Sequence, residues 1–405
     1  MTRISRLISP NKLVQKLSNF HRFFLAAILF TGLCVAAPCA NAQSKPDKDY
    51  LVYVISEGAD EITLVRFGPS GARIEREVPT GDMPTDIDGP HGIAVSRDQK
   101  FYFVSLGHGR PYGSVWKYAT DGDRVLGKAT LGYFPATMDL SADGSLLYVA
   151  NFNLHGDPVP SSVSVVATGP MMEVARIPTC VMPHGSRLNP QGTKHYSVCM
   201  MDDLLVEIDT QTLKVSRNFL LTKGREMGMT GPVQRSNGEM SQIDMGGHGA
   251  EAPQPGNASC SPTWAQPSHD GSSIFVACNS SSEIVEIDSA TWKLARRIPA
   301  RAGVYNLAIT HDGRLLLATN KRDQSVSVIE IKSGRELARI PTRRRVLHGA
   351  TISPDDRYAF VSVEGIGAEP GTVEIVDLMS LKLVASVDVP EQAAGIEFLR
   401  IEPPK

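Results

Sequence analysis

The sequence predicts an all-β fold, a seven-bladed β-propeller in which the two ends of the chain share one blade. Three observations lead to this prediction. A strand–turn–strand phrase recurs seven times at blade-length spacing, glycine and proline are spread evenly along the chain, and no long amphipathic helix stands out. Many short strands joined by turns are expected from such a distribution, and a repeat fold accounts for the length in one domain.

Each repeat is aligned on one residue, which we call the anchor, seven positions before a turn residue that is usually aspartate. Successive anchors are 45, 48, 79, 42, 43 and 46 residues apart, and a four-stranded blade takes about 40 to 50 residues. The seven anchors are His91, Ala136, His184, Thr263, Tyr305, His348 and Ala394. Each anchor begins the innermost strand of a blade, so it should lie at one mouth of the central channel, here called the top.

The last repeat contains an inner strand only. The segments LVYVISEG, EITLVRF and ARIEREVP, which begin at Leu51, Glu61 and Ala72, read as the second, third and fourth strands that this repeat lacks. The sequence therefore predicts a last blade made from both ends of the chain. Such a closure removes the exposed sheet edges that an open array would leave.

Residues 1–42 have the layout of a secretory signal peptide. A basic leader precedes an apolar run of about 15 residues, and Ala40-Asn41-Ala42 forms a small-x-small cleavage site before Gln43. The run is too short for a convincing membrane span. We expect residues 43–405 to be exported to the periplasm or secreted, with no membrane insertion. The net charge of −2 and the lack of a basic stripe argue against a nucleic-acid partner.

The repeated phrases resemble those of the YVTN-type propellers of secreted and surface-layer proteins. PHGIAVSRD at His91 and LHGATISPD from Leu347 carry the resemblance, which covers nearly all of residues 50 to 401. More distantly, the chain resembles the propellers of methylamine dehydrogenase heavy chains, cytochrome d1, nitrous oxide reductases and lactonases. The resemblance implies the fold and leaves the function open, because this fold hosts unrelated chemistries.

Six histidines fall on the predicted top face, and each is followed by glycine. They are His91, His108, His155, His184, His248 and His348. Imidazole is the commonest metal ligand and suits copper, zinc, iron and nickel, and a following glycine lets a ligand or loop approach closely. The alternative is that the anchor histidines belong to the repeat itself, since Pro-His-Gly recurs in YVTN repeats of proteins with no known site.

An insertion of about residues 224–259 accounts for the long spacing between the third and fourth anchors. It is rich in glycine, proline and polar residues, has no strand pattern, and carries Met227, Met229, Met240, Met245 and His248. We expect a loop over the top face, because long loops in compact folds are usually functional or disordered. Thioether and imidazole together favour copper; the alternative is a surface loop whose methionines cover apolar surface.

Four cysteines remain after the leader, an even number that suggests disulfides in an oxidising compartment. The repeat places Cys180 and Cys260 just before inner strands, and Cys199 and Cys278 at the top ends of neighbouring second strands. We therefore predict the pairs Cys180–Cys199 and Cys260–Cys278. The rival reading is a thiolate metal ligand beside His184.

These observations favour an exported propeller that binds a transition metal, copper first and zinc as the alternative, in a histidine-lined top funnel. Such a metal could serve an oxidoreductase acting on a small molecule, with a periplasmic redox partner. Two other functions fit the sequence. One is a non-catalytic binding or scaffold propeller for a protein or cell-wall partner, and the other is a lactonase-like hydrolase. For the latter the sequence offers Arg187, Arg345 and Glu364, and Asp86 and Asp88 could orient His91.

Overall fold

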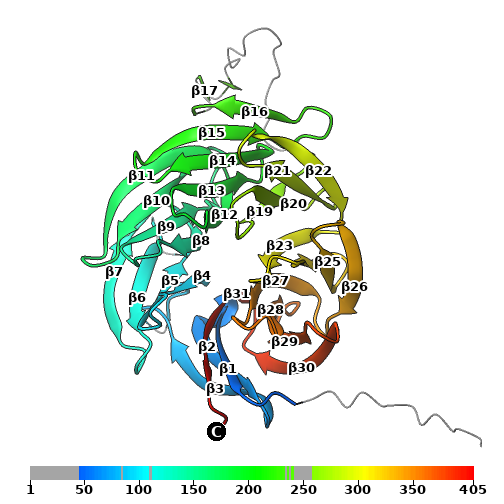
Figure 1. The fold of residues 1–405 in the computed structure, drawn as a ribbon. Helices are drawn as coiled ribbons and strands as arrows, with labels where there is room; N and C mark the ends of the chain where they lie inside the picture. Colours follow the sequence, from blue (N-terminus) through cyan, green and yellow to red (C-terminus); the bar gives the residue numbers. More distant parts are fainter. Residues whose placement is uncertain (1–44, 84, 109–111, 233–234, 237–238, 241–257) are drawn as a thin grey trace, which may run out of the picture. The chain divides into compact units, whose positions relative to one another are not determined.

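A computed structural model describes residues 45–83, 85–108, 112–232, 235–236, 239–240 and 258–405 (Figure 1). The predicted signal peptide, His248 and Met245 lie outside these residues. Apart from one turn of 3-10 helix, η1 (Glu57–Ala59), the regular elements described are strands. Seven antiparallel sheets of four or five strands form the blades, which confirms the predicted all-β, seven-bladed β-propeller. Within the described part of the chain, no helix has the length and apolar character that crossing a bilayer requires.

Blades 1 to 7 follow the order of the anchors, and each sheet runs from an inner strand to an outer one. The inner strands are β4 (Pro90–Val95), β8 (Pro135–Leu140), β12 (Pro183–Leu188), β19 (Pro262–Pro267), β23 (Val304–Ile309), β27 (Val346–Ile352) and β31 (Ala393–Glu402). The second strands are β5 (Phe101–Leu106), β9 (Leu146–Asn151), β13 (Lys194–Cys199), β20 (Ser273–Cys278), β24 (Leu315–Asn320), β28 (Tyr358–Glu364) and β1 (Asp49–Ser56). The third strands are β6 (Ser114–Ala119), β10 (Pro160–Ala167), β14 (Leu204–Asp209), β21 (Glu283–Asp288), β25 (Ser325–Glu330), β29 (Gly371–Asp377) and β2 (Glu61–Gly68). The fourth strands are β7 (Val125–Thr130), β11 (Met172–Val181), β15 (Lys214–Leu220), β22 (Lys293–Pro299), β26 (Arg335–Pro341), β30 (Lys382–Val389) and β3 (Gly71–Pro79).

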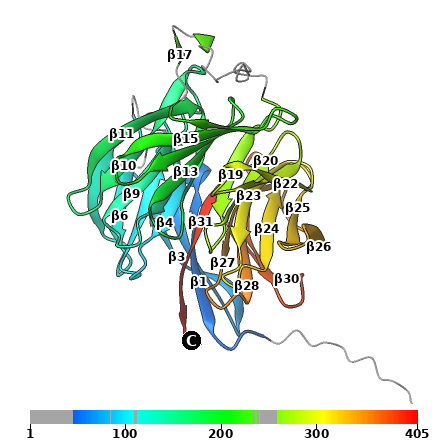
Figure 2. The same ribbon diagram turned by 45° about the horizontal axis from the view of Figure 1, so that its top comes forward.

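The ring closes through blade 7. There β1 pairs with β2 on one side and with β31 on the other, so that Tyr53 lies opposite Glu397. Strand β31 also contacts β27 of blade 6 and β4 of blade 1, and it lies between them in both views (Figures 1 and 2). The predicted closure by both ends of the chain is therefore confirmed.

The core lies between blades. Second and third strands are largely buried, whereas fourth strands alternate exposed and half-buried side chains. Between blades 7 and 1, the rings of Tyr53, Tyr102 and Tyr118 stack with centroids 4.5 and 4.9 Å apart. Aromatic pairs at such distances add to the burial of apolar surface, so each blade is stabilised mainly by its neighbours.

Six of the inner strands share an irregularity at the anchor. In blades 1 to 6 the pairing between inner and second strand shifts register there, which is the mark of a β-bulge. In blade 1, the Ser105 hydroxyl accepts a hydrogen bond from the Gly92 amide at 2.8 Å and donates one to the Ala136 carbonyl of blade 2 at 2.7 Å. Ser362 makes the same two contacts, to the Gly349 amide and the Ala394 carbonyl, between blades 6 and 7. The second strand thus joins neighbouring inner strands.

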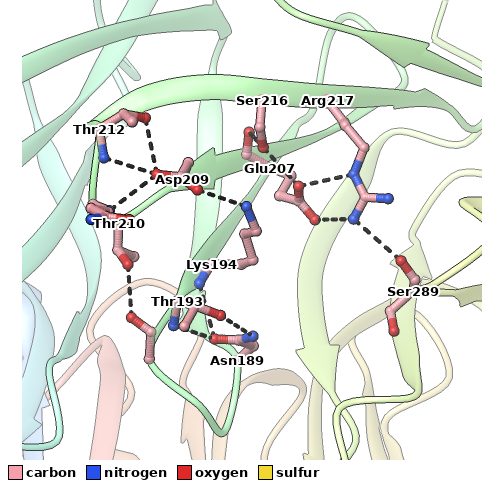
Figure 3. A network of polar contacts seen from close by, with 12 residues as sticks. Asn189, Thr193, Lys194, Glu207, Asp209, Thr210, Thr212, Ser216, Arg217 and Ser289 are labelled. Atoms are coloured by element: carbon pink, nitrogen blue, oxygen red, sulfur yellow. Dashed lines mark hydrogen bonds and ion pairs between the residues drawn. The ribbon is translucent and has the colours of Figure 1, made fainter.

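Polar contacts join the outer strands as well (Figure 3). In blade 3, the Glu207 carboxylate accepts a hydrogen bond from Arg217 Nε at 2.9 Å, and the same guanidinium reaches the Ser289 carbonyl of blade 4 at 3.2 Å. Nearby, Lys194 Nζ lies 2.8 Å from an Asp209 oxygen. Glu207 is 1% exposed, and the paired guanidinium offsets the cost of burying its charge.

Both predicted disulfides are present. Cys180 is bonded to Cys199 and Cys260 to Cys278, with Cα atoms 5.8 and 4.5 Å apart. Each bond joins the segment before an inner strand to the end of the second strand of blade 3 or blade 4. The reading of Cys180 and Cys199 as thiolate metal ligands beside His184 is therefore wrong, because the two sulfurs are bonded to one another.

The described part of the insertion differs from the expectation of a strandless loop over the top face. Its residues include β16 (Met227–Thr230), which pairs with β15 as a fifth, outermost strand of blade 3, and two short strands, β17 (Arg235–Ser236) and β18 (Glu239–Met240). Figure 1 shows β16 outside β15. Met229 is buried against the core between blades 2 and 3, so this methionine covers apolar surface. The alternation Met-Gly-Met-Thr is too weakly apolar to have signalled a strand.

Candidate functional site

Four of the seven anchors are aromatic and meet at the top of the channel. The ring centroids follow a closed cycle, His91 to His184 at 6.1 Å, His184 to Tyr305 at 5.7 Å, Tyr305 to His348 at 5.1 Å, and His348 back to His91 at 5.1 Å. We call these four residues the collar. Each of the four lies at a register shift of its inner strand, and each is less than a tenth exposed.

The remaining anchors, Ala136, Thr263 and Ala394, are small and leave room for the four rings. The backbones of Thr263 and Ala394 also hydrogen-bond to rings of the collar. His184 Nδ1 lies 2.7 Å from the Thr263 carbonyl, and the His348 ring hydrogen-bonds the Ala394 backbone. Burial, together with the charge of His91, lowers the pKa of His184 to about 3, and burial beside Lys321 lowers the pKa of His348 well below its ordinary value. Both are therefore neutral, hydrogen-bonded imidazoles at neutral pH.

His91 has a different partner. Its Nδ1 lies 2.7 Å from Glu57 Oε2, whereas its Nε2 is buried and has no hydrogen-bond partner among the described residues. The sequence suggested Asp86 and Asp88 as the residues that orient His91. The structure instead places Glu57 of blade 7 within hydrogen-bond distance of the His91 ring. A ring held by a carboxylate while its other nitrogen has no partner is a candidate for chemistry, and this separates His91 from the two other anchor histidines.

Glu57 bridges two histidines, since its Oε1 lies 3.0 Å from His108 Nε2. Burial disfavours the charged form of Glu57, but the charge of His91 and the hydrogen bonds from His108 and His91 outweigh it and hold the pKa of Glu57 well below its usual range. The hydrogen bond to Glu57 raises the pKa of His108, despite partial burial of the ring. The His108 side chain is 27% exposed, so this member of the group is open to solvent.

Lys321 and Glu364 form a second charged pair at the collar. Lys321 Nζ lies 3.4 Å from Glu364 Oε1 and 3.8 Å from the centroid of the Tyr305 ring. The same carboxylate oxygen is 3.9 Å from His348 Nε2. Burial lowers the pKa of Lys321, although the charges of Glu364 and Glu57 oppose this change. Lys321 therefore contacts both Glu364 and the collar residue Tyr305.

Two further predicted residues, His155 and Arg345, have definite places. His155 is exposed beside His108, with ring centroids 5.2 Å apart, and Phe134 packs against both rings at 5.4 and 5.3 Å. Arg345 is exposed.

Arg187 lies away from the top funnel. It borders a bottom cavity of about 460 Å³ together with Asp139, Gln266 and Glu397. Arg187 follows its anchor by three positions and therefore lies further down the inner strand. Its closeness to the anchor in sequence led to the wrong expectation that it lies in the top funnel.

The glycine after each anchor histidine has a packing role. A Cβ on Gly92 would lie 2.0 Å from the Ala136 carbonyl oxygen of the next blade, and Gly185 has a φ of +61° and meets Trp264 at 3.0 Å. The structure thus accounts for Gly92 and Gly185 by contact between inner strands, and neither glycine is evidence for a ligand.

Glu57 and Lys321 were missed in the sequence. Glu57 directly follows the second strand β1 and Lys321 follows β24, while Glu364 ends β28 and His108 comes two residues after β5. Their position in the repeat could have identified them, because a charged residue at the end of a second strand reaches the top of the channel.

A metal centre receives no direct support from these residues. Within the described ranges, no group of three or more His, Cys, Asp or Glu side chains is arranged to hold a metal ion. His248 and Met245 lie outside those ranges. The copper and zinc predictions therefore stay predictions.

Comparisons with known proteins identify the fold. No family model and no curated protein matches the sequence. Among solved structures, the chain is similar to hydrazine synthase of Kuenenia stuttgartiensis, with 20% identity, a TM-score of 0.58, and coverage of 78% of this chain and 92% of that one. It is similar to the periplasmic gluconolactonase PpgL of Pseudomonas aeruginosa, with 18% identity, a TM-score of 0.63, and coverage of 88% and 100%. A protein from Lactobacillus plantarum shares 15% identity, with a TM-score of 0.62 and coverage of 87% and 100%. At these identities the comparisons show the β-propeller fold and leave the family open.

Proposed function

We propose that this protein is an exported hydrolase that opens a small lactone-class ester at the top of the channel. The observation that carries the proposal is the Glu57 carboxylate held between His91 and His108, together with the Lys321 ammonium over the ring of the collar residue Tyr305. A carboxylate-oriented imidazole is the usual form of a general base. A cation close to it suits the negative charge that develops on a carbonyl oxygen under attack.

The reaction follows from these groups. Neutral His108 uses Nδ1, the nitrogen not bonded to Glu57, to take a proton from water, and the hydroxide oxygen forms a bond to the lactone carbonyl carbon. Lys321 stabilises the oxyanion. The bond between that carbon and the ring oxygen then breaks, and the His108 imidazolium returns the proton to the leaving alkoxide. The product is a hydroxy acid, which ionises, and Glu57 keeps the His108 ring oriented throughout.

Three further observations support the proposal. A periplasmic gluconolactonase is among the proteins of similar fold, and two disulfides suit an oxidising compartment outside the cytoplasm. The hydrogen bond to Glu57 raises the pKa of His108, which makes this imidazole a stronger acceptor for a proton from water.

The test is a pH-stat assay of acid release from a panel of sugar and aliphatic lactones. His108→Gln and Lys321→Met should each lower kcat/KM by about 100-fold or more. His311→Asn is the matched control, because His311 also pairs with a carboxylate, Asp356 at 2.8 Å, but lies in the turn after an inner strand, at the other end of the blade. Equal rates in His108→Gln and wild type would reject the proposed base. No turnover of any lactone would favour the scaffold or binding function.

A second candidate is transition-metal binding, copper before zinc, as the histidine pattern predicts. The observation that favours it is that His91, His184 and His348 each use one ring nitrogen in a bond to a carboxylate or carbonyl, as metal-ligating histidines commonly do. Metal content should be measured by mass spectrometry on protein purified without chelator, with and without His91→Ala/His184→Ala/His348→Ala. About one copper per chain that is lost in the folded variant would support this candidate, and oxidoreductase assays would follow. Metal-free protein that also ignores added copper and zinc would reject it.

A further inference from the structure

A small cavity of about 30 Å³ lies within the channel below the collar. Its wall includes two collar residues and residues from the five other inner strands. The polar residues of the wall are His91, Thr137, Arg187, Trp264, Asn306 and His348. Arg187 also borders the larger bottom cavity, so the small cavity lies between the collar and that space. A single water needs about 10–15 Å³ of such volume, so there is room for one or two waters or one monatomic ion.

Four residues of this wall carry a buried polar atom that has no hydrogen-bond partner in the described residues. The atoms are His91 Nε2, Thr137 Oγ1, Trp264 Nε1 and Asn306 Oδ1. Their residues are 6%, 7%, 5% and 4% exposed. Buried polar groups without partners destabilise a folded protein, and clusters of them are rare. Four such groups from four blades around one cavity indicate a bound species that hydrogen-bonds to them.

The charges around the cavity indicate the sign of the charge on the bound species. Arg187 is the fixed charge of the wall, and its guanidinium carbon lies 4.4 Å from the centroid of the Trp264 ring. No carboxylate is among the residues of the wall, whereas Asp139 and Glu397 border the bottom cavity instead.

Three of the four unpartnered groups agree with this sign; His91 Nε2 is a donor only when the ring carries both protons, because Nδ1 faces the Glu57 carboxylate. The Trp264 indole can only donate, the Thr137 hydroxyl can donate, and the Asn306 amide can present its NH2 group after a half-turn that exchanges oxygen and nitrogen. A positive charge with several donors and no carboxylate suits an anion.

We propose that this cavity is a binding site for one halide-sized monovalent anion, of which chloride is the common example. The anion accepts hydrogen bonds from Trp264 and Thr137 beside Arg187. Because its ligands come from different blades, it binds the closed ring and not the unfolded chain, and so it stabilises the ring. This site does not depend on the hydrolase proposal, which concerns the opposite side of the collar.

The first test compares thermal unfolding of the full chain in sodium chloride and in sodium methanesulfonate at equal ionic strength, since methanesulfonate is too large for the cavity and is not a product of lactone hydrolysis. We expect chloride to raise the midpoint by about 2 °C or more, with saturation. Trp264→Phe keeps an aromatic ring but removes the N–H, and it should abolish the chloride effect. Trp116→Phe is the control, because Trp116 Nε1 bonds Ser114 at 3.0 Å within blade 1; it should keep the effect.

The second test is crystallographic. Crystals soaked in sodium bromide should show an anomalous peak inside the cavity, and the peak should be absent in Thr137→Val. This second variant also replaces Trp264→Phe in the thermal test if Trp264→Phe fails to fold. Equal midpoints in the two salts, together with a cavity that shows water density and no anomalous peak, would overturn the proposal. The buried groups would then be satisfied by water alone.

Discussion

Glu397 gives the sharpest quantitative prediction. It lies on β31, opposite Tyr53, and borders the bottom cavity. Burial raises the pKa of Glu397 from an ordinary 4.5 to about 7; Arg187 opposes this rise and the Asp139 carboxylate adds to it. The folded chain therefore binds this proton more tightly than the unfolded chain does. The contribution of Glu397 to the free energy of unfolding is therefore largest below pH 4.5, and it is lost as the pH rises toward 7.

The size of the effect follows from the two pKa values. A tenfold change in proton affinity corresponds to about 1.4 kcal/mol, so the full penalty for ionising Glu397 is about 3 kcal/mol, and about 2.5 kcal/mol of it falls between pH 5 and pH 8. Glu397→Gln removes the titrating group while keeping the shape of the side chain. The free energy of unfolding of the variant, relative to wild type, should rise by about 2.5 kcal/mol over that interval.

The assay is guanidinium unfolding followed by tryptophan fluorescence at pH 5 and pH 8. Other titrating groups cancel in the comparison of variant and wild type. Asp121→Asn, which changes an exposed aspartate in the turn before β7, should leave the pH dependence unchanged. If Glu397→Gln loses stability with pH as steeply as wild type does, Glu397 is ionised in the folded protein throughout, and the reasoning from burial is refuted.

Three further changes test the packing of the ring. Cys260→Ser/Cys278→Ser opens a loop with a sequence separation of 18 residues and should lower the free energy of unfolding by about 3 kcal/mol. Reduction of the wild type should cause a similar loss of stability. If neither the variant nor reduction lowers stability, this prediction is wrong. Ser105→Ala leaves two buried backbone groups without their partner and should cost about 1–3 kcal/mol by urea unfolding. Gly92→Ala places a methyl group 2.0 Å from the Ala136 carbonyl oxygen, so it should lower the thermal midpoint more than Ser105→Ala does.

The repeat predicted the architecture in detail because it is a pattern of strands at fixed spacing. The anchors mark the inner strands, and the same alignment placed Cys180 beside Cys199 and assigned β1 to the blade of β31. It failed at β16, whose residues alternate too weakly to show a strand.

The candidate site could be predicted only in part. The alignment brought His91, His184 and His348 to one mouth of the channel, where the structure has them. It could not show that two of these rings are held by backbone carbonyls, because backbone partners leave no trace in side-chain identity. Nor could it show that Glu57, at the far end of the alignment, reaches His91. That contact depends on ring closure, which brings the end of β1 beside blade 1.

The shared seventh blade also bears on how the molecule is made. Strands β1 to β3 are the first to be synthesised and β31 is the last, so the early strands must wait for a partner more than 330 residues downstream, as the separation between Tyr53 and Glu397 shows. Until that partner arrives, the nascent chain exposes the edge of β1 and the flank of β4. Contacts this distant in sequence slow folding and leave strand edges open to aggregation. We therefore expect the pairing of β31 with β1 to be the slow step of folding. We also expect chaperones that shield strand edges to prevent aggregation most in chains that lack only their last ten residues.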